Sequence, residues 1–147
     1  MSIDQDFDLQ NFLPYLLNQA SEESSLSFQK IYKDRYGMLR TEWRVLFHLG
    51  IYGRMTAKEI GTRSKMHKTK ISRAVAKLAE RRFLTRERDE DDRRLEYLEL
   101  TRAGQQAYRD LRSVADEYDK QLASQFSQDE VQILRRLLRR LAGVSDG

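Results

Sequence analysis

The side chains best suited to chemistry in this chain of 147 residues are basic, and one segment concentrates them. Residues 63–88 contain ten Lys and Arg side chains against two Glu, whereas residues 1–26 contain five acidic side chains and no basic one. Such a density of positive charge suits a polyanion, since Lys and Arg contacts with phosphate groups release counterions. A solvated helix surface would give the same composition, so charge alone leaves both interpretations open.

The centre of the basic segment predicts a helix from about His67 to Arg81. Its apolar residues recur every three to four positions and form one stripe, as in a helix with one buried side. The opposite side carries side chains that can reach base edges, because Arg can hold guanine with two hydrogen bonds and Thr can contact a thymine methyl group. We expect this helix to bind duplex DNA through Lys65, His67, Lys68, Thr69, Lys70, Ser72, Arg73 and Lys77.

A change of periodicity after this helix predicts a β-hairpin, with strands Leu84–Arg88 and Leu95–Leu100 around a charged turn. Arginines near the tip of such a hairpin can enter a narrow minor groove. We expect Arg86, Arg88, Arg93 and Arg94 to contact DNA.

Acidic residues in the same turn need an explanation, because they would repel phosphate. Asp89 and Asp92 can fold back on neighbouring arginines and orient them. The alternative is a carboxylate metal site that includes Asp91, and with a metal ion it could serve a nuclease. The turn lacks the glycine that oxygen-ligated calcium loops use, so we expect no metal.

The remaining sequence predicts helices around this core. Four of them begin behind Ser or Thr caps, and Thr56 with Glu59 and Ser127 with Glu130 form capping-box patterns. The fold class is therefore mainly α with a small β-hairpin wing, that is, a winged helix-turn-helix core with terminal helices. These other helices are expected from about Pro14 to Tyr36, from Glu42 to Leu49 behind Thr41, behind Thr56 up to a turn near Gly61–Ser64, from Thr101 to about Ser124, and after Ser127.

The terminal helices carry more apolar surface than the core of so small a domain needs. A two-fold homodimer explains this excess better than an intrachain core. The residues expected at the interface are Leu13, Leu16, Leu17, Tyr118, Leu122, Leu134, Leu138 and Leu141.

Composition argues against several other classes of protein. The absence of cysteine excludes disulfides, zinc sites with thiolate ligands and redox sensing through a thiol;. Apolar stretches fall far short of the ~20 residues that a membrane span needs, and no secretory signal is visible. Neither His48 nor His67 belongs to a recognisable catalytic motif, so we expect no enzyme, no catalytic residue and no cofactor. A cytoplasmic location on the nucleoid is the expectation.

Five segments in order resemble the MarR family of bacterial regulators. They are Leu39–Leu46, Thr56–Ile60, Ile71–Leu78, Arg86–Arg94 and Leu100–Gly104. The resemblance implies that the helix containing residues 72–78 lies in the major groove and that a wing arginine enters the minor groove. It also implies that the first and last helices of two subunits interlock, and that a small, often aromatic ligand releases the DNA.

One position departs from the family pattern. Arg82 stands where the family usually has glycine, before the first wing strand, and glycine takes a positive φ there without strain. The departure concerns the geometry between helix and wing, and it leaves the case for DNA binding intact.

We therefore expect one MarR-type domain over residues 9–145, with a DNA-binding lobe at 38–100 and dimerisation regions at 9–36 and 101–143. The expected function is that of a sequence-specific transcriptional regulator, a homodimeric repressor on a pseudo-palindromic operator that a small, aromatic effector relieves. A ligand pocket is expected near Tyr32, Tyr36, Trp43 and Tyr52. The alternative is a winged-helix adaptor that binds protein or nucleic acid without reading an operator.

Overall fold

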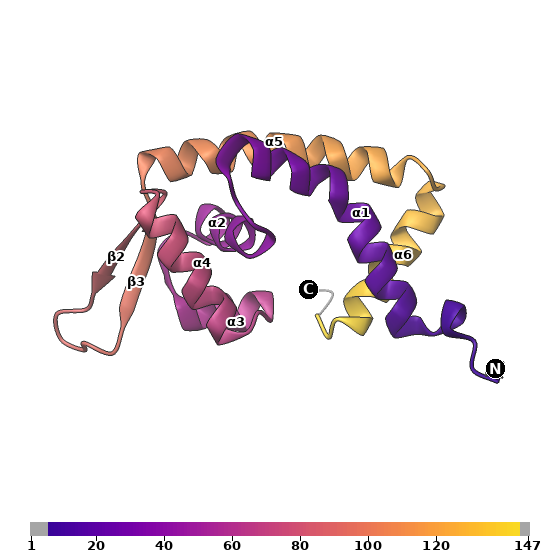
Figure 1. Cartoon of the computed structure of the whole chain (residues 1–147), viewed down its shortest axis with the longest axis horizontal. Coiled ribbons are helices and arrows are strands. Elements are labelled where there is room, and N and C mark those ends of the chain that lie inside the picture. The colour runs from indigo at the N-terminus through magenta and orange to yellow at the C-terminus, as the bar shows by residue number, and fades with distance from the viewer. Residues whose placement is uncertain (1–5, 145–147) are drawn as a thin grey trace, which may run out of the picture. The chain divides into compact units, whose positions relative to one another are not determined.

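The computed structural model describes residues 6–144, so residue 145 at the end of the expected domain lies outside the described residues. Figure 1 shows the helices and the small sheet in chain order. The fold class is confirmed, since six α-helices accompany one small antiparallel sheet. After a 3-10 turn at Leu9–Asn11, the elements are α1 (Leu13–Tyr36), α2 (Arg40–Tyr52), β1 (Met55–Thr56), α3 (Ala57–Ser64), α4 (Lys68–Glu80), β2 (Leu84–Arg88), β3 (Glu96–Leu100), α5 (Arg102–Ala123) and α6 (Gln128–Leu141).

The chain forms two compact units, and the division between them falls within α5, between Arg112 and Ser113. The first unit contains α1 to α4, the sheet and the first half of α5. The second contains the rest of α5 and α6.

The core of the first unit explains why α4 folds as a helix at this place. Ile71, Ala74, Val75 and Leu78, the predicted apolar stripe, are all at most 2% exposed. Burying a side chain of the size of Leu or Ile contributes about 1.5–3 kcal/mol, so this stripe fixes which side of α4 faces solvent. Residues of α2, β3 and α5 also belong to the core, among them Val45, Leu46, Leu49, Leu98 and Leu111.

Most predicted helix starts are confirmed by their hydrogen bonds. Thr56 Oγ1 accepts from Glu59 N at 3.2 Å, and Thr101 Oγ1 accepts from Gly104 N at 3.1 Å. Ser127 and Glu130 form the complete reciprocal box.

Three predicted helix boundaries are wrong. Helix α2 continues three residues beyond Leu49 to Tyr52 and ends at Gly53, whose N–H donates to Leu49 O. Local interactions also explain the other two differences. Helix α2 begins at Arg40 instead of Glu42, because the buried Glu42 carboxylate accepts from Leu39 N and replaces Thr41 as the cap. Helix α3 continues through Ser64, and the chain turns at Lys65, which adopts a left-handed φ of 60°.

The sheet has the strand order β1-β3-β2, and both pairs are antiparallel. The predicted hairpin is present, with Leu84 opposite Leu100 and Arg88 opposite Glu96. Leu95 lies outside β3. Strand β1 was not predicted, because two residues are too few to show a period.

Candidate nucleic-acid interface

The solvent side of α4 carries the polar residues that the sequence singled out. Packing of the apolar stripe turns Lys68, Thr69, Lys70, Ser72, Arg73, Ala76 and Lys77 outward, and all seven are exposed. Within residues 6–144, the side chains of Lys68, Lys70, Arg73 and Lys77 form no ion pair or hydrogen bond. Their charges are therefore available to an external partner, beside a small Ala76 that permits close approach.

The start of α4 is set by an unusual cap. His67 Nδ1 accepts a hydrogen bond from Thr69 N at 3.2 Å. Nδ1 is the acceptor in this bond, so Nε2 is the ring nitrogen that can donate to another group. In the preceding turn, Ser64 Oγ accepts from Met66 N at 3.2 Å. His67 thus shapes the helix start, while its Nε2–H remains a donor.

A hollow of about 500 Å³ lies between α3 and α4. Ala57, Gly61 and Ile71 contribute apolar lining, and Lys58 and Lys68 contribute positive charge. Helices α3 and α4 approach closely at Gly61, where a Cβ atom would lie 3.1 Å from Ile71 Cδ1.

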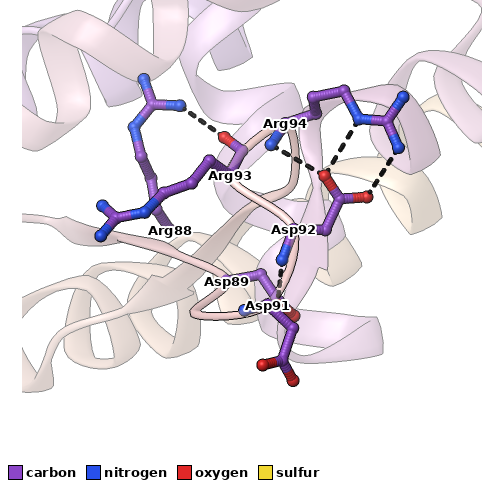
Figure 2. A network of polar contacts seen from close by, with 6 residues as sticks. All are labelled: Arg88, Asp89, Asp91, Asp92, Arg93 and Arg94. Carbon is purple, nitrogen blue, oxygen red and sulfur yellow. Dashed lines mark hydrogen bonds and ion pairs between the residues drawn. The ribbon is translucent and has the colours of Figure 1, made fainter.

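Strands β2 and β3 and the loop between them form the wing. Acidic residues fix the conformation of this loop (Figure 2). Asp92 accepts from Arg94 Nε at 3.0 Å and from Arg94 Nη2 at 3.2 Å, and its Oδ1 also accepts from Arg94 N. Asp89 Oδ1 accepts from the backbone N–H groups of Asp91 and Asp92 at 2.8 and 3.0 Å. These bonds fold the loop and hold Arg94, whose side chain is still 90% exposed.

The electrostatics of the loop agree with this arrangement. The side-chain hydrogen bonds from Arg94, followed by the bond from its backbone N–H, hold the pKa of Asp92 below its usual value. Arg88 Nη1 donates to Arg93 O at 2.9 Å, which closes the loop from the opposite strand. Among the described residues, no group of three His, Asp or Glu side chains could hold a metal ion. This includes the aspartates of the wing loop.

At the base of the wing, Arg86, which was also predicted to contact DNA, forms an ion pair within the sheet. Arg86 pairs with Glu96 across the strands, at 2.9 Å from Nη2 to Oε1, so this guanidinium is committed to the sheet. Arg54 lies over the Tyr97 ring at 4.4 Å and pairs with Glu87. Sequence reasoning missed Arg54 and Glu96, and only knowledge of the strand register would have brought them to attention.

The residues expected at a dimer interface lie in both units, and each unit leaves them uncovered. In the first unit Leu13 and Leu16 are exposed and Leu17 is half-buried. In the second, Tyr118 and Leu122 are half-buried, and α6 has no buried residue. On α6, Leu134, Leu138 and Leu141 are 43%, 41% and 60% exposed.

The four aromatic residues expected at a ligand pocket make separate contacts. Tyr32 and Trp43 pack together with ring centroids 5.9 Å apart. Tyr36 contacts Phe83 instead, and Tyr52 lies under the guanidinium of Arg63.

A search of the described helices for a membrane span finds none that is both long and apolar enough.

Comparisons with known proteins agree with this geometry. Residues 36–95 match the family model described as MarR family. The uncharacterised HTH-type transcriptional regulator YwaE of Bacillus subtilis is 27% identical over 107 residues, which cover 73% of this chain. The match spans 63% of the length of YwaE, so less than two thirds of that relative is represented.

Solved structures share the fold over nearly the whole chain. A MarR/EmrR family transcriptional regulator from Acinetobacter sp. ADP1 has a TM-score of 0.82 and 26% identity, covering 93% of this chain and 96% of its own. Two structures below 25% identity share the fold. MepR of S. aureus, in complex with DNA, has a TM-score of 0.81 at 20% identity, with 90% and 96% covered. BpsR of Bordetella bronchiseptica, whose DNA binding is regulated by 6-hydroxynicotinic acid, has a TM-score of 0.80 at 19% identity. The match covers 88% of this chain and 98% of BpsR.

The structure, the family model and the relatives therefore converge on one assignment. The exposed basic helix, the wing and the order of elements are those of a winged helix-turn-helix;. Residues 36–95 match the MarR family model, and the fold is that of the MarR/EmrR family transcriptional regulators.

Proposed function

We propose that this protein is a sequence-specific regulator of transcription that binds a pseudo-palindromic operator in double-stranded DNA as a homodimer. The observation that carries the proposal is the outward side of α4. Its basic and hydroxyl side chains have no hydrogen-bond or ion-pair partner within residues 6–144, and they lie next to the ordered wing. The DNA complex of MepR, which has the same fold, supports the choice of DNA as the partner. Such a regulator acts in the bacterial cytoplasm, on the nucleoid.

The roles of individual residues follow from their chemistry. Thr69, Ser72 and Arg73 contact base edges in the major groove, where Arg distinguishes guanine. Phosphate affinity comes from Lys65, Lys68, Lys70 and Lys77, and His67 donates to a phosphate through Nε2. On the wing, Arg94 enters the minor groove in the orientation that Asp92 gives it, with Arg93 beside it;.

Selection from a randomised duplex pool, followed by sequencing, tests this function. Enrichment of a palindrome is expected, with affinity that falls steeply as salt concentration rises. Replacing Arg73 with Ala should cost roughly 1–3 kcal/mol on the selected operator and relax base preference, whereas Lys77→Ala should weaken all sequences alike. Lys30→Ala, at an exposed position of α1, is the control and should change neither the operator affinity nor the base preference. Salt-sensitive binding without enrichment would contradict the proposal and favour an adaptor with an electrostatic surface.

The homodimer is supported by the uncovered leucine stripe of α6. Burying an exposed Leu contributes on the order of 1.5–3 kcal/mol, so several of them per subunit provide a substantial driving force. Leu138→Arg should convert the protein to a monomer in sedimentation experiments. Gln132→Arg introduces the same charge on the opposite side of α6 and should leave the dimer intact. A monomeric wild-type protein at micromolar concentration would contradict the proposal.

Repression by occlusion of a promoter, relieved by a small aromatic effector, completes the proposed function. A ligand need only bind one spacing of the two recognition helices better than another to shift the population and release DNA. The regulation of BpsR by 6-hydroxynicotinic acid supports an aromatic acid as the class to screen. Fluorescence anisotropy on the selected operator should identify a compound that weakens binding. The absence of any effect across a panel of hydroxylated aromatic acids would contradict the assigned ligand class.

A further inference from the structure

The point where the end of α1 meets the end of α4 contains a tie between two elements distant in sequence. Arg81 follows α4 directly, and its Nη1 donates to Tyr36 O and to Gly37 O, each at 2.7 Å. These carbonyls lie at the C-terminal end of α1, where the helix dipole is negative and a cation is favourable;. The Arg81 guanidinium therefore closes the end of α1.

Gly37 makes this close approach possible in two ways. It takes a left-handed φ of 63° as the cap of α1, a conformation that glycine adopts without strain;. A Cβ atom on residue 37 would lie 2.7 Å from Arg81 Nη1, so a side chain there would displace the guanidinium. The glycine and the arginine thus fit as a pair.

Contacts of Tyr36 extend this tie to two further elements of the first unit. Tyr36 OH donates to Asp110 Oδ2 on α5 at 2.6 Å, and Arg35 pairs with the same carboxylate at 2.9 Å. The Tyr36 ring packs edge-on against Phe83, the residue before β2, with centroids 6.1 Å apart. The last turn of α1 therefore contacts α5 and both sides of the turn that leaves α4.

The Arg81 guanidinium differs from the side chains assigned to DNA because backbone carbonyls of α1 already bind it. It lies at the end of α4 next to the start of α5, whereas Lys68 and α3 lie at the other end (Figure 1). The neighbouring Arg82 provides an internal comparison. Its guanidinium has no hydrogen bond or ion pair within residues 6–144, although its charge and sequence position are nearly the same as those of Arg81.

We propose that Arg81 is a positioning residue for operator recognition, one that fixes the direction of α4 relative to α1 without touching DNA. The proposal rests on the proposed function. In a homodimer, two recognition helices must enter successive major grooves about one helical turn apart. Because Leu13 and Leu16 on α1 are expected dimer contacts, a tie between α1 and α4 sets the spacing of those helices. Its loss therefore weakens the preference for one operator spacing and leaves the number of phosphate contacts unchanged.

The test compares Arg81→Ala with Arg82→Ala, which removes the same charge from the adjacent position. Each is titrated with the selected operator and with versions that have one base pair inserted or removed at the centre, at several salt concentrations. Hydrogen bonds from a charged group are stronger than neutral ones, but solvent exposure reduces their contribution, so Arg81→Ala should weaken binding about three- to tenfold. It should also bind the altered spacings almost as well as the selected one, with an unchanged salt slope. Arg82→Ala should behave like the wild type, and Arg81→Lys should be intermediate.

Two results would overturn the proposal. A salt slope reduced by about one in Arg81→Ala would mean that Arg81 contacts a phosphate directly. Equal operator affinity and spacing preference for Arg81→Ala and Arg82→Ala would mean that the tie positions nothing. If Arg81→Ala does not fold, the Arg81→Lys comparison decides the same question.

Failure of the proposed function would look different. If the wild type selects no operator, DNA recognition by this protein is refuted, whatever the variants do. The tie is then tested by amide hydrogen exchange, which should accelerate in the last turns of α1 and α4 in Arg81→Ala and stay unchanged in Arg82→Ala. Unchanged exchange in both variants would refute the tie itself.

Discussion

Replacing Arg82 with glycine should stabilise the protein, because Arg82 holds a left-handed backbone conformation with φ of 65°. This conformation costs a residue with a Cβ atom about 1–2 kcal/mol. Glycine avoids that cost but loses about 0.5–1 kcal/mol more backbone entropy on folding. The difference is a gain of about 0.5–1 kcal/mol.

The hydrogen bonds at Arg82 do not offset this gain, since all of them involve its backbone. Arg82 N donates to Ala79 O at 3.0 Å, and Arg82 O accepts from Thr101 Oγ1 at 2.7 Å. Glycine retains both bonds.

Urea unfolding is the appropriate assay, with the free energy taken from the midpoint at an unchanged slope. A gain of this size should raise the melting temperature by about 1–4 °C. Arg82→Ala is the matched control, because it removes the side chain but keeps the Cβ atom, and it should lie within about 0.5 kcal/mol of the wild type. If the glycine variant is no more stable than the alanine variant, backbone strain at this position is refuted.

Three further predictions concern other contacts. Asp92→Ala should lower operator affinity although it removes a negative charge, because Arg94 loses the carboxylate that orients it;. Higher affinity in a titration would show that repulsion between Asp92 and the DNA phosphates dominates. Gly104→Ala should destabilise the fold by about 3 kcal/mol or more, since its Cβ would lie 2.0 Å from Phe83 O, and a wild-type melting temperature by circular dichroism would contradict this;. Burial, and then a hydrogen bond to a carboxylate on α5, raises the pKa of Tyr36 from 10.0 to about 12, so its contribution to stability is complete below pH 10 and is lost as the pH rises towards 12;. Between these pH values the wild type should lose more stability in urea unfolding than Tyr36→Phe does. Equal losses in the two proteins would contradict the assignment.

The sequence was sufficient to predict the helices whose stability is local or amphipathic. The stripe of Ile71 and Leu78 shows its period in the sequence, and the Ser127 cap needs only a glutamate three residues later;. The start of α2 was missed because the side chain that caps it, Glu42, lies inside the helix. Strand β1 was missed because its two residues are strand only through pairing with β3.

The candidate interface divides in the same way. Outward residues on α4 follow from the inward stripe, so periodicity was enough to find Arg73 and Lys77;. The bond between Asp92 and Arg94 spans two residues and could be anticipated. Arg81 could not be assigned a role from the sequence, since its partners lie 44 and 45 residues away and only the packing of α1 against the end of α4 brings them together.

The order of strands in the sheet has a consequence for solubility. Strand β3 lies between β1 and β2, so β2 has one unpaired edge, and an open edge can recruit a strand from another molecule;. The residues Thr85 to Arg88 on this edge are all exposed, and Arg86, Glu87 and Arg88 place charge on both faces of the strand. A second wing aligned in parallel and in register would bring identical charges together. The charged side chains of β2 thus discourage the wing from aggregating, and replacing Arg86 and Arg88 together with Val should produce a protein that precipitates.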